Sequence, residues 1–265
     1  MDKKRKDHNR ILTGAAPLLF WTAVWALAAR AVGQELLIPA PSSVLEHLAA
    51  IVRDESFFAV IGTSFLRIIC GFATGCLTGV VLAALCSLSQ VLKAVFSPAV
   101  DMISSVPVTS FIILVMLWLR YSLVPVFISA LLVMPVIFGN VMTGISQTDP
   151  LLIETAKIYR IGPWKALTKL YIPSVLPYFY SGAVTGIGLA WKSGIAAEVL
   201  ALPKKAIGSG MYYSKLYLET ADLFAWTIIV AVFSLALSRL LSFFVKKTAP
   251  KAQRVADPKE DSHEA

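Results

Sequence analysis

Hydrophobic positions along this chain are gathered into six long runs, which charged or turn-forming segments separate. The runs cover residues 11–32, 60–88, 98–119, 123–145, 173–200 and 223–245. A helix needs about 20 mostly apolar residues to cross a bilayer, so each run can form one transmembrane helix. Only residues 120–122 separate the third run from the fourth, and we expect these two to form an antiparallel helical hairpin. The pattern predicts an all-α, polytopic membrane protein with about six spans.

Composition supports this prediction. Hydrophobic residues make up 57% of the chain and charged residues 15%, and the mean hydropathy is +0.73; soluble domains are far more polar. A net charge of +8 could indicate nucleic-acid binding. The basic residues flank the apolar runs, however, and do not form one soluble face. We therefore expect contact with membrane lipid and no binding of nucleic acid.

The distribution of Lys and Arg predicts the orientation, because loops rich in them tend to stay in the cytoplasm. Five of them lie within residues 1–10, and five more lie within residues 246–265. We expect both segments to be cytoplasmic tails, the second one disordered, around a transmembrane domain over residues 11–245. The outer loops carry fewer basic residues, although Lys204, Lys205 and Lys215 weaken the contrast. A signal peptide is the alternative for the first run, but the run is long for that.

Small residues recur at regular spacing in two of the runs. In the second run they follow one another every four residues, and the fifth run repeats the spacing: Gly71, Gly75 and Gly79, then Gly182 and Gly186. Such rows allow a second helix to approach closely. Packing within the chain, a subunit interface and a sliding contact all remain open. The three cysteines fall in the second run without a nearby His, which indicates neither a metal site nor a disulfide framework.

A short amphipathic helix is expected outside the membrane, in "IPAPSSVLEHL". Its two prolines disfavour helix, and Ser42 or Ser43 is a suitable N-cap. Apolar residues then follow at helical spacing, which is typical of a helix that lies at the interface. We expect His47, on its polar side, to be solvated.

Charged residues inside the apolar runs are candidates for function, because each costs about 2.5–3.5 kcal/mol at a span centre unless it is paired or faces water. Arg67 and Asp101 are close enough to span ends to reach the interface. Lys192 and Glu198 are six residues apart, so they point to nearly opposite faces and should not pair. We name both as candidate residues of a translocation pathway. Our hypothesis is that Lys192 faces a wet central path and favours an anionic or polar substrate.

The segment "ETAKIYRIGPWKALTKLYIP" is a long charged interruption between the fourth and fifth runs. Asp149 is a suitable N-cap for a helix over residues 149–161, with a proline at its first position. Gly162 is expected to stop this helix and Pro163 to start a second one. Two further prolines, Pro173 and Pro177, are expected to interrupt the chain before the fifth run. We predict two short helices with a tight elbow on the cytoplasmic side.

This segment resembles the EAA loop of the inner-membrane permease subunits of bacterial ABC importers. That pattern has Glu-Ala-Ala, a Gly eight residues after the Glu, and a final hydrophobic-Xaa-hydrophobic-Pro. Within the loop at about 146–172, the matching positions are Glu154, Ala156, Gly162, Leu170, Ile172 and Pro173. The middle position of the triplet departs from the pattern, since Thr155 stands there. Over residues 38–245, segments such as "GLAWKSGIAAEVLA" are also similar to the nitrate/sulfonate/taurine branch of this family.

The resemblance implies a type I ABC importer permease fold in a bacterial inner membrane. Two permease subunits, here expected to be two copies of this chain, would form the path. Two copies of a cytoplasmic ATP-binding cassette subunit would hydrolyse ATP, and an extracytoplasmic binding protein would deliver a small oxyanion or sulfonate-like solute. The residues that the resemblance assigns to coupling with the ATPase are Glu154, Thr155, Ala156, Gly162, Pro163 and Pro173.

We expect this chain to bind no cofactor and to catalyse no reaction, because it has no GxxxxGK[ST] loop for ATP. A secondary, ion-coupled transporter or an intramembrane enzyme is the alternative. An enzyme of that kind needs a nucleophile and base, or metal ligands, within the spans, whereas all three His lie outside them. A secondary transporter often has inverted repeats and several intramembrane carboxylates, and neither is evident.

Overall fold

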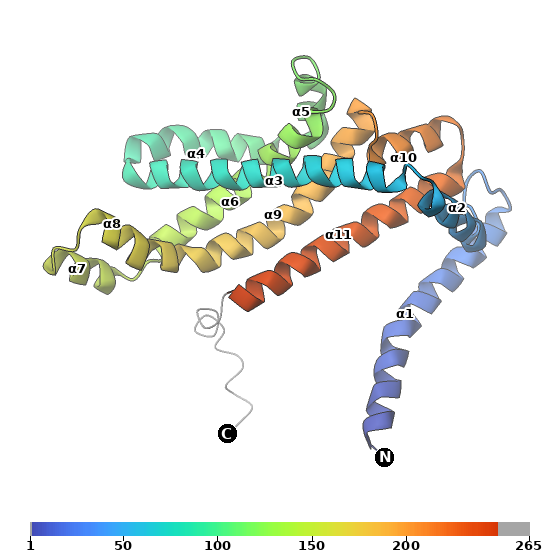
Figure 1. Ribbon diagram of the computed structural model, residues 1–265, viewed down its shortest axis with the longest axis horizontal. Coiled ribbons are helices and arrows are strands. Elements are labelled where there is room, and N and C mark those ends of the chain that lie inside the picture. The colour runs from blue at the N-terminus through green and yellow to red at the C-terminus, as the bar shows by residue number, and fades with distance from the viewer. Residues whose placement is uncertain (1, 249–265) are drawn as a thin grey trace.

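The computed structural model describes residues 2–248, and within them the side chains of residues 16–17 and 19–245. All secondary structure in this part of the chain is helical (Figure 1). The helices are α1 (Asp2–Val32), α2 (Pro41–Arg53), α3 (Phe57–Leu88), α4 (Gln90–Ser105), α5 (Val108–Val115), α6 (Val124–Ser146), α7 (Pro150–Ile158), α8 (Pro163–Ala166), the π-helical turn η1 (Leu167–Tyr171), α9 (Ile172–Ala201), α10 (Ile207–Leu216) and α11 (Thr220–Thr248). Most of the tail predicted over residues 246–265 lies outside the described residues.

Three helices are long and apolar enough to cross a membrane: Phe57–Leu88, Val124–Ser146 and Thr220–Val245. They coincide with the second, fourth and sixth predicted spans. α1 and α9 coincide with the first and fifth; within α1, the apolar stretch that falls on continuously described side chains is Leu19–Val32. α9 has 30 residues and carries Lys192 and Glu198 along its length. The fold is therefore all-α with several spans, as predicted, while the count of six is only partly supported.

The third predicted span, residues 98–119, is wrong as one continuous helix. The chain instead forms α4 and α5, which are bent by 101° at the break between them. Pro107 causes the break, because it lacks a backbone N–H and keeps the preceding residue out of the helical region; Val106 accordingly has φ −81° and ψ 135°. Upstream, α4 begins at Gln90, where Ser89 Oγ accepts a hydrogen bond from Leu92 N. Pro98, which we expected to start a span, lies inside α4.

The centre of the molecule is built from α3, α6 and α9, which pack at close range. The α3 glycine row faces α6: a Cβ added at Gly71, Gly75 or Gly79 would lie 2.5 to 2.8 Å from a backbone carbonyl oxygen of that helix. On α9, a Cβ at Gly182 would meet Asn140 of α6 at 3.0 Å, and one at Gly186 would meet Val133 at 3.4 Å. Both glycine rows therefore lie at contacts between helices of one chain.

The outer helix α2 differs from the prediction in two details. It begins at Pro41 with Ala40 as N-cap, not at Ser42 or Ser43, because proline is well suited to the first helical position. His47 is also not simply solvated. Its Nδ1 lies 2.6 Å from Asp222 Oδ1, so α2 is joined to the first turn of α11.

Candidate functional site

The segment between α6 and α9 forms the elbow that the sequence predicts, with a shorter first helix. Asp149 caps α7 as predicted, since its Oδ1 accepts a hydrogen bond from Leu151 N at 2.8 Å. α7 ends at Ile158 and not at Ile161. The residue that reverses the chain is Arg160, in the left-handed region at φ 47°, and Ile161 N donates to Ala156 O across it. Gly162 therefore does not stop this helix; a Schellman-type turn centred on Arg160 does.

The second half of the elbow runs into the membrane-spanning helix without a gap. Gly162 is extended, with φ −61° and ψ 153°, and Pro163 is at the first position of α8. α8, η1 and α9 then follow one another directly. The interruption expected at Pro173 and Pro177 is wrong: Pro173 lies in the first turn of α9 and Pro177 lies inside that helix. In the π turn before them, Ile172 N donates to Leu167 O, five residues back. α8 is thus joined to α9 without an intervening loop.

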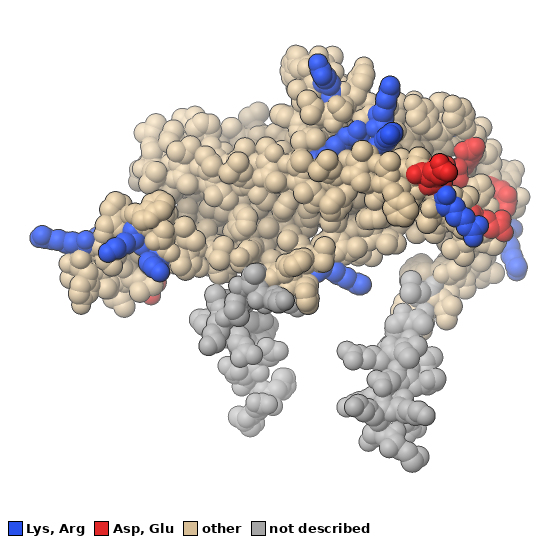
Figure 2. Space-filling model, in the orientation of Figure 1, with Lys and Arg blue, Asp and Glu red and all other residues tan. Residues whose placement is uncertain are grey.

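The elbow presents a large apolar surface. Neither α7 nor α8 contains a buried residue, and both lie at one end of the molecule, away from the central helices (Figure 1). The large exposed side chains here are Leu151, Leu152, Ile158, Tyr159, Ile161 and Trp164. Basic side chains surround this surface (Figure 2). Exposed apolar patches of this kind mark contacts with another protein or with the membrane.

The motif residues lie on α7 and at the elbow. Glu154 and Thr155 are exposed and Ala156 is half-buried. The hydroxyl of Thr155 donates to Leu151 O at 2.7 Å, so the residue that departs from the family pattern has its polar group satisfied within the helix. Pro163 is exposed at the start of α8, and Pro173 is exposed near the start of α9.

Lys192 lies on a narrow exposed stripe of an otherwise buried helix. Within α9, the exposed residues Ser181, Thr185 and Lys192 share one face at helical spacing, while most of the remaining surface is buried. Among the described side chains, Lys192 has no ion-pair partner. It is therefore a cation on a polar stripe that the single chain leaves uncovered.

Glu198 has different surroundings, and the structure does not bring it together with Lys192. Its side chain is fully buried and accepts hydrogen bonds from Ser64 Oγ at 2.9 Å and Gly208 N at 3.2 Å. Arg67 Nη1 lies 3.5 Å from its Oε1. Sequence reasoning missed this pair. The available signal was that two opposite charges in apolar runs each need a partner.

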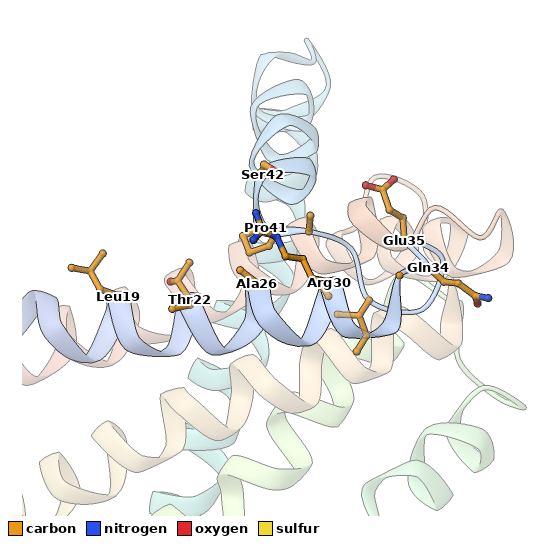
Figure 3. Close-up of a pocket in the computed structure, with 13 residues that line it drawn as sticks. Leu19, Thr22, Ala26, Arg30, Gln34, Glu35, Pro41 and Ser42 are labelled. Atoms are coloured by element: carbon orange, nitrogen blue, oxygen red, sulfur yellow. The ribbon is translucent and has the colours of Figure 1, made fainter.

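A separate pocket of about 480 Å³ lies between α1 and the segment that leads into α2 (Figure 3). Arg30 extends from α1 toward the start of α2, close to Pro41 and Ser42. None of the residues predicted to act in coupling or transport lines this pocket.

Long apolar helices, an uncovered polar stripe and an exposed elbow continuous with α9 fit the membrane subunit of a transporter. The sequence profile of the family described as "Binding-protein-dependent transport system inner membrane component" matches residues 71–254. The chain belongs to this family.

Known relatives agree with this assignment. The nitrate import permease protein of Synechococcus elongatus is 25% identical over 249 residues, which cover 88% of either chain. The taurine transport system permease protein of Escherichia coli is 22% identical, with 86% of this chain and 85% of the relative aligned. A solved structure titled as an amino acid ABC transporter with histidines shares the fold at a TM-score of 0.59 and 19% identity, covering 71% of this chain and 91% of that one.

The protein is accordingly a multi-pass inner-membrane protein and the permease subunit of an ABC importer. The family is not enzymatic, and its members associate with an ATP-binding subunit and a substrate-binding protein. An ion-coupled secondary transporter is not favoured.

Proposed function

We propose that this chain forms the translocation path of an ATP-driven importer. The conformational change of the ATPase subunits reaches the path through α7 and α8. The observation that carries the proposal is the exposed apolar elbow, whose second helix continues directly into α9. The coupling residues are those of the motif, from Glu154 to Pro173. Both chain termini and the elbow lie in the cytoplasm, and residues 11–245 form the permease domain.

In the assembly, two copies of this chain pair with two ATPase subunits, which alone hydrolyse ATP. Closure of the ATPase dimer displaces α7 and α8. A rigid connection passes that displacement to α9, whereas a flexible loop would absorb it. Because α9 packs along α6, and α6 along α3, the three helices respond as a unit and switch access to the path.

The transported solute is a small oxyanion or a sulfonate. Two observations support this class: relatives named for nitrate and taurine import, and the cation of Lys192 on the uncovered stripe of α9. A positive charge that no described side chain neutralises is stabilised by an anion in the path.

Substitution of Gly162 tests the coupling role. A Cβ added there meets no atom within 4 Å, and its φ of −61° suits any residue. Gly162→Leu should therefore leave the thermal stability of the isolated permease unchanged, yet abolish binding-protein-stimulated ATP hydrolysis and uptake in the reconstituted complex. Gly62→Leu is the matched control, because Gly62 is equally open on α3. Normal transport by Gly162→Leu would refute coupling at this elbow.

A further inference from the structure

The connection between α9 and α10 displays two lysines on an otherwise buried stretch. From residue 201 to residue 209, only Lys204 and Lys205 are exposed. Among the described side chains, neither lysine has an ion-pair partner. Solvated lysines usually lie among other exposed residues. Here the two lysines are the exposed residues of a turn that is otherwise buried or half-buried, and we ask what holds them there.

The backbone of this turn is fixed to α3. Arg67 Nη2 donates to Lys204 O at 3.0 Å, and its Nη1 donates to Lys205 O at 3.3 Å. The hydroxyl of Thr63 also donates to Lys205 O. Lys205 itself is in the left-handed region, at φ 51°. A non-glycine residue persists in that region only where its surroundings hold it. The carbonyl groups of both lysines are thus held while their side chains are left free.

Glu198 stabilises the turn from its buried side. Its carboxylate lies beside Arg67 and accepts from Gly208 N, in the first turn of α10. Ser64 Oγ, which donates to the same carboxylate, accepts from Ile207 N at 3.0 Å. α10 has no side-chain cap of its own, so Glu198 and Ser64 supply the acceptors that its first N–H groups need. One buried carboxylate therefore fixes α3, α9 and α10 around the lysine turn.

We propose that the Lys204–Lys205 turn is a preorganised docking point for an acidic surface of the extracytoplasmic binding protein, with Arg67 as its positioning residue. The proposal rests on the orientation proposed above, in which this turn lies outside. Lys and Arg side chains gather near the end of α9, and Asp and Glu side chains stand beside α2 (Figure 2). Because the backbone of the turn is already held, docking has to order only the two lysine side chains, and complementary charge speeds encounter.

A protein surface fits these lysines better than a lipid does. The side chains next to them in sequence are buried or half-buried, so the turn offers no exposed apolar surface to hold acyl chains. A phospholipid site normally combines a cation with such a surface. The experiments below nevertheless distinguish binding of a lipid headgroup from docking of a protein.

The test uses the full complex of permease, ATPase and binding protein in nanodiscs of phosphatidylcholine. ATP hydrolysis is measured against the concentration of the binding protein. We expect the double variant K204E/K205E to raise the half-maximal concentration about tenfold, since two exposed ion pairs are lost and replaced by repulsion. The plateau rate should stay unchanged. Raising the salt concentration should weaken docking of the native protein and strengthen docking of the double variant, because salt screens attraction and repulsion alike.

Two further variants separate docking from other effects. Lys215→Glu is the matched control, because Lys215 is an exposed cation on α10; it should change the half-maximal concentration less than threefold. Arg67→Lys keeps the charge beside Glu198 but cannot bond to both carbonyl groups in the same fork geometry. It should raise the half-maximal concentration with the plateau unchanged. An unchanged value would overturn the positioning role of Arg67.

Labelling distinguishes failure of this proposal from failure of the orientation. A cysteine at position 205, in a chain with Cys70, Cys76 and Cys86 replaced by Ala, should react with a membrane-impermeant maleimide added outside intact cells. Absence of labelling would overturn the orientation. Labelling with an unaltered half-maximal concentration for K204E/K205E would overturn docking alone. An effect that occurs only in nanodiscs with anionic lipid would assign the turn to lipid and also overturn docking.

Discussion

Nη1 of Arg67 (α3) and Oε1 of Glu198 (α9) lie 3.5 Å apart and form a partly buried ion pair between residues 131 positions apart in the chain. The carboxylate is fully buried, whereas the Arg67 side chain is 17% exposed. Every polar atom of the pair that faces the interior has a partner among the described residues. The pair therefore avoids the large cost that a lone charge would have in a span.

Removal of the carboxylate should destabilise the protein strongly. Glu198→Ala removes the counter-charge of Arg67, whose guanidinium keeps only its bonds to the Lys204 and Lys205 carbonyl groups, and it removes the acceptor of Gly208 N. Breaking an ion pair whose carboxylate is fully buried costs about 3 kcal/mol. Glu198→Gln keeps an oxygen acceptor of similar shape, so it should lose less. The measurement is thermal unfolding of the detergent-solubilised permease. Unfolding temperatures equal to that of the native protein for both variants would show that the charge and its bonds contribute nothing.

Substitution within the α3 glycine row should separate α3 from α6. A Cβ at Gly75 would lie 2.7 Å from Ala130 O, a backbone atom that cannot move aside alone, so Gly75→Val should lower the yield of folded protein severalfold. Gly62→Val, on the same helix with nothing within 4 Å of its Cβ, is the control. Yield is read from the monodisperse peak in size-exclusion chromatography, and equal peaks would contradict the tight contact.

The sequence predicted correctly those helix starts and spans that depend on residues close together in the chain. The cap at Asp149, the start of α8 at Pro163 and the second, fourth and sixth apolar spans all depend on residues near in sequence, and they appear where the pattern places them. Pro107 is also a local signal, because a proline favours a helix break. The long apolar run around it nevertheless predicts a single span. The left-handed conformation that ends α7 is usually adopted by glycine, but here Arg160 adopts it. The sequence therefore indicated the reversal at Gly162, two residues too late.

Contacts between distant residues could not be predicted in the same way. Glu198 was correctly separated from Lys192 by helical geometry, yet its partner lies on a helix whose register against α9 depends on packing through α6. His47 finds Asp222 only because α2 folds back onto α11. The periodicity of a sequence determines which residues share a face, but it does not determine which other helix that face meets.

The exposed tryptophan of the elbow should matter only in the complex. Trp164 is 74% exposed, so Trp164→Ser should leave the unfolding temperature of the isolated permease nearly unchanged. If the ATPase covers this ring, the loss of a buried aromatic anchor should weaken its binding about 30-fold. Trp118, 72% exposed beyond the end of α5, is the matched control. Retention of the ATPase subunit during affinity purification measures the effect, and equal retention by both variants would place the ATPase contact elsewhere.

Replacement of Lys192 should change which solutes are transported more than whether the protein folds. Its side chain is exposed and has no ion-pair partner among the described residues, so Lys192→Met removes a charge without leaving a buried group unsatisfied. Uptake of an anionic solute in proteoliposomes should fall at least tenfold, because the anion then enters the low-dielectric path without a counter-charge. Lys192→Arg retains the charge and should restore much of the uptake, and ATP hydrolysis stimulated by the empty binding protein should be similar in all three proteins. Unaltered uptake and selectivity in Lys192→Met would mean that the stripe of α9 faces lipid or a neighbouring subunit, and that the path for the anion is lined by another helix.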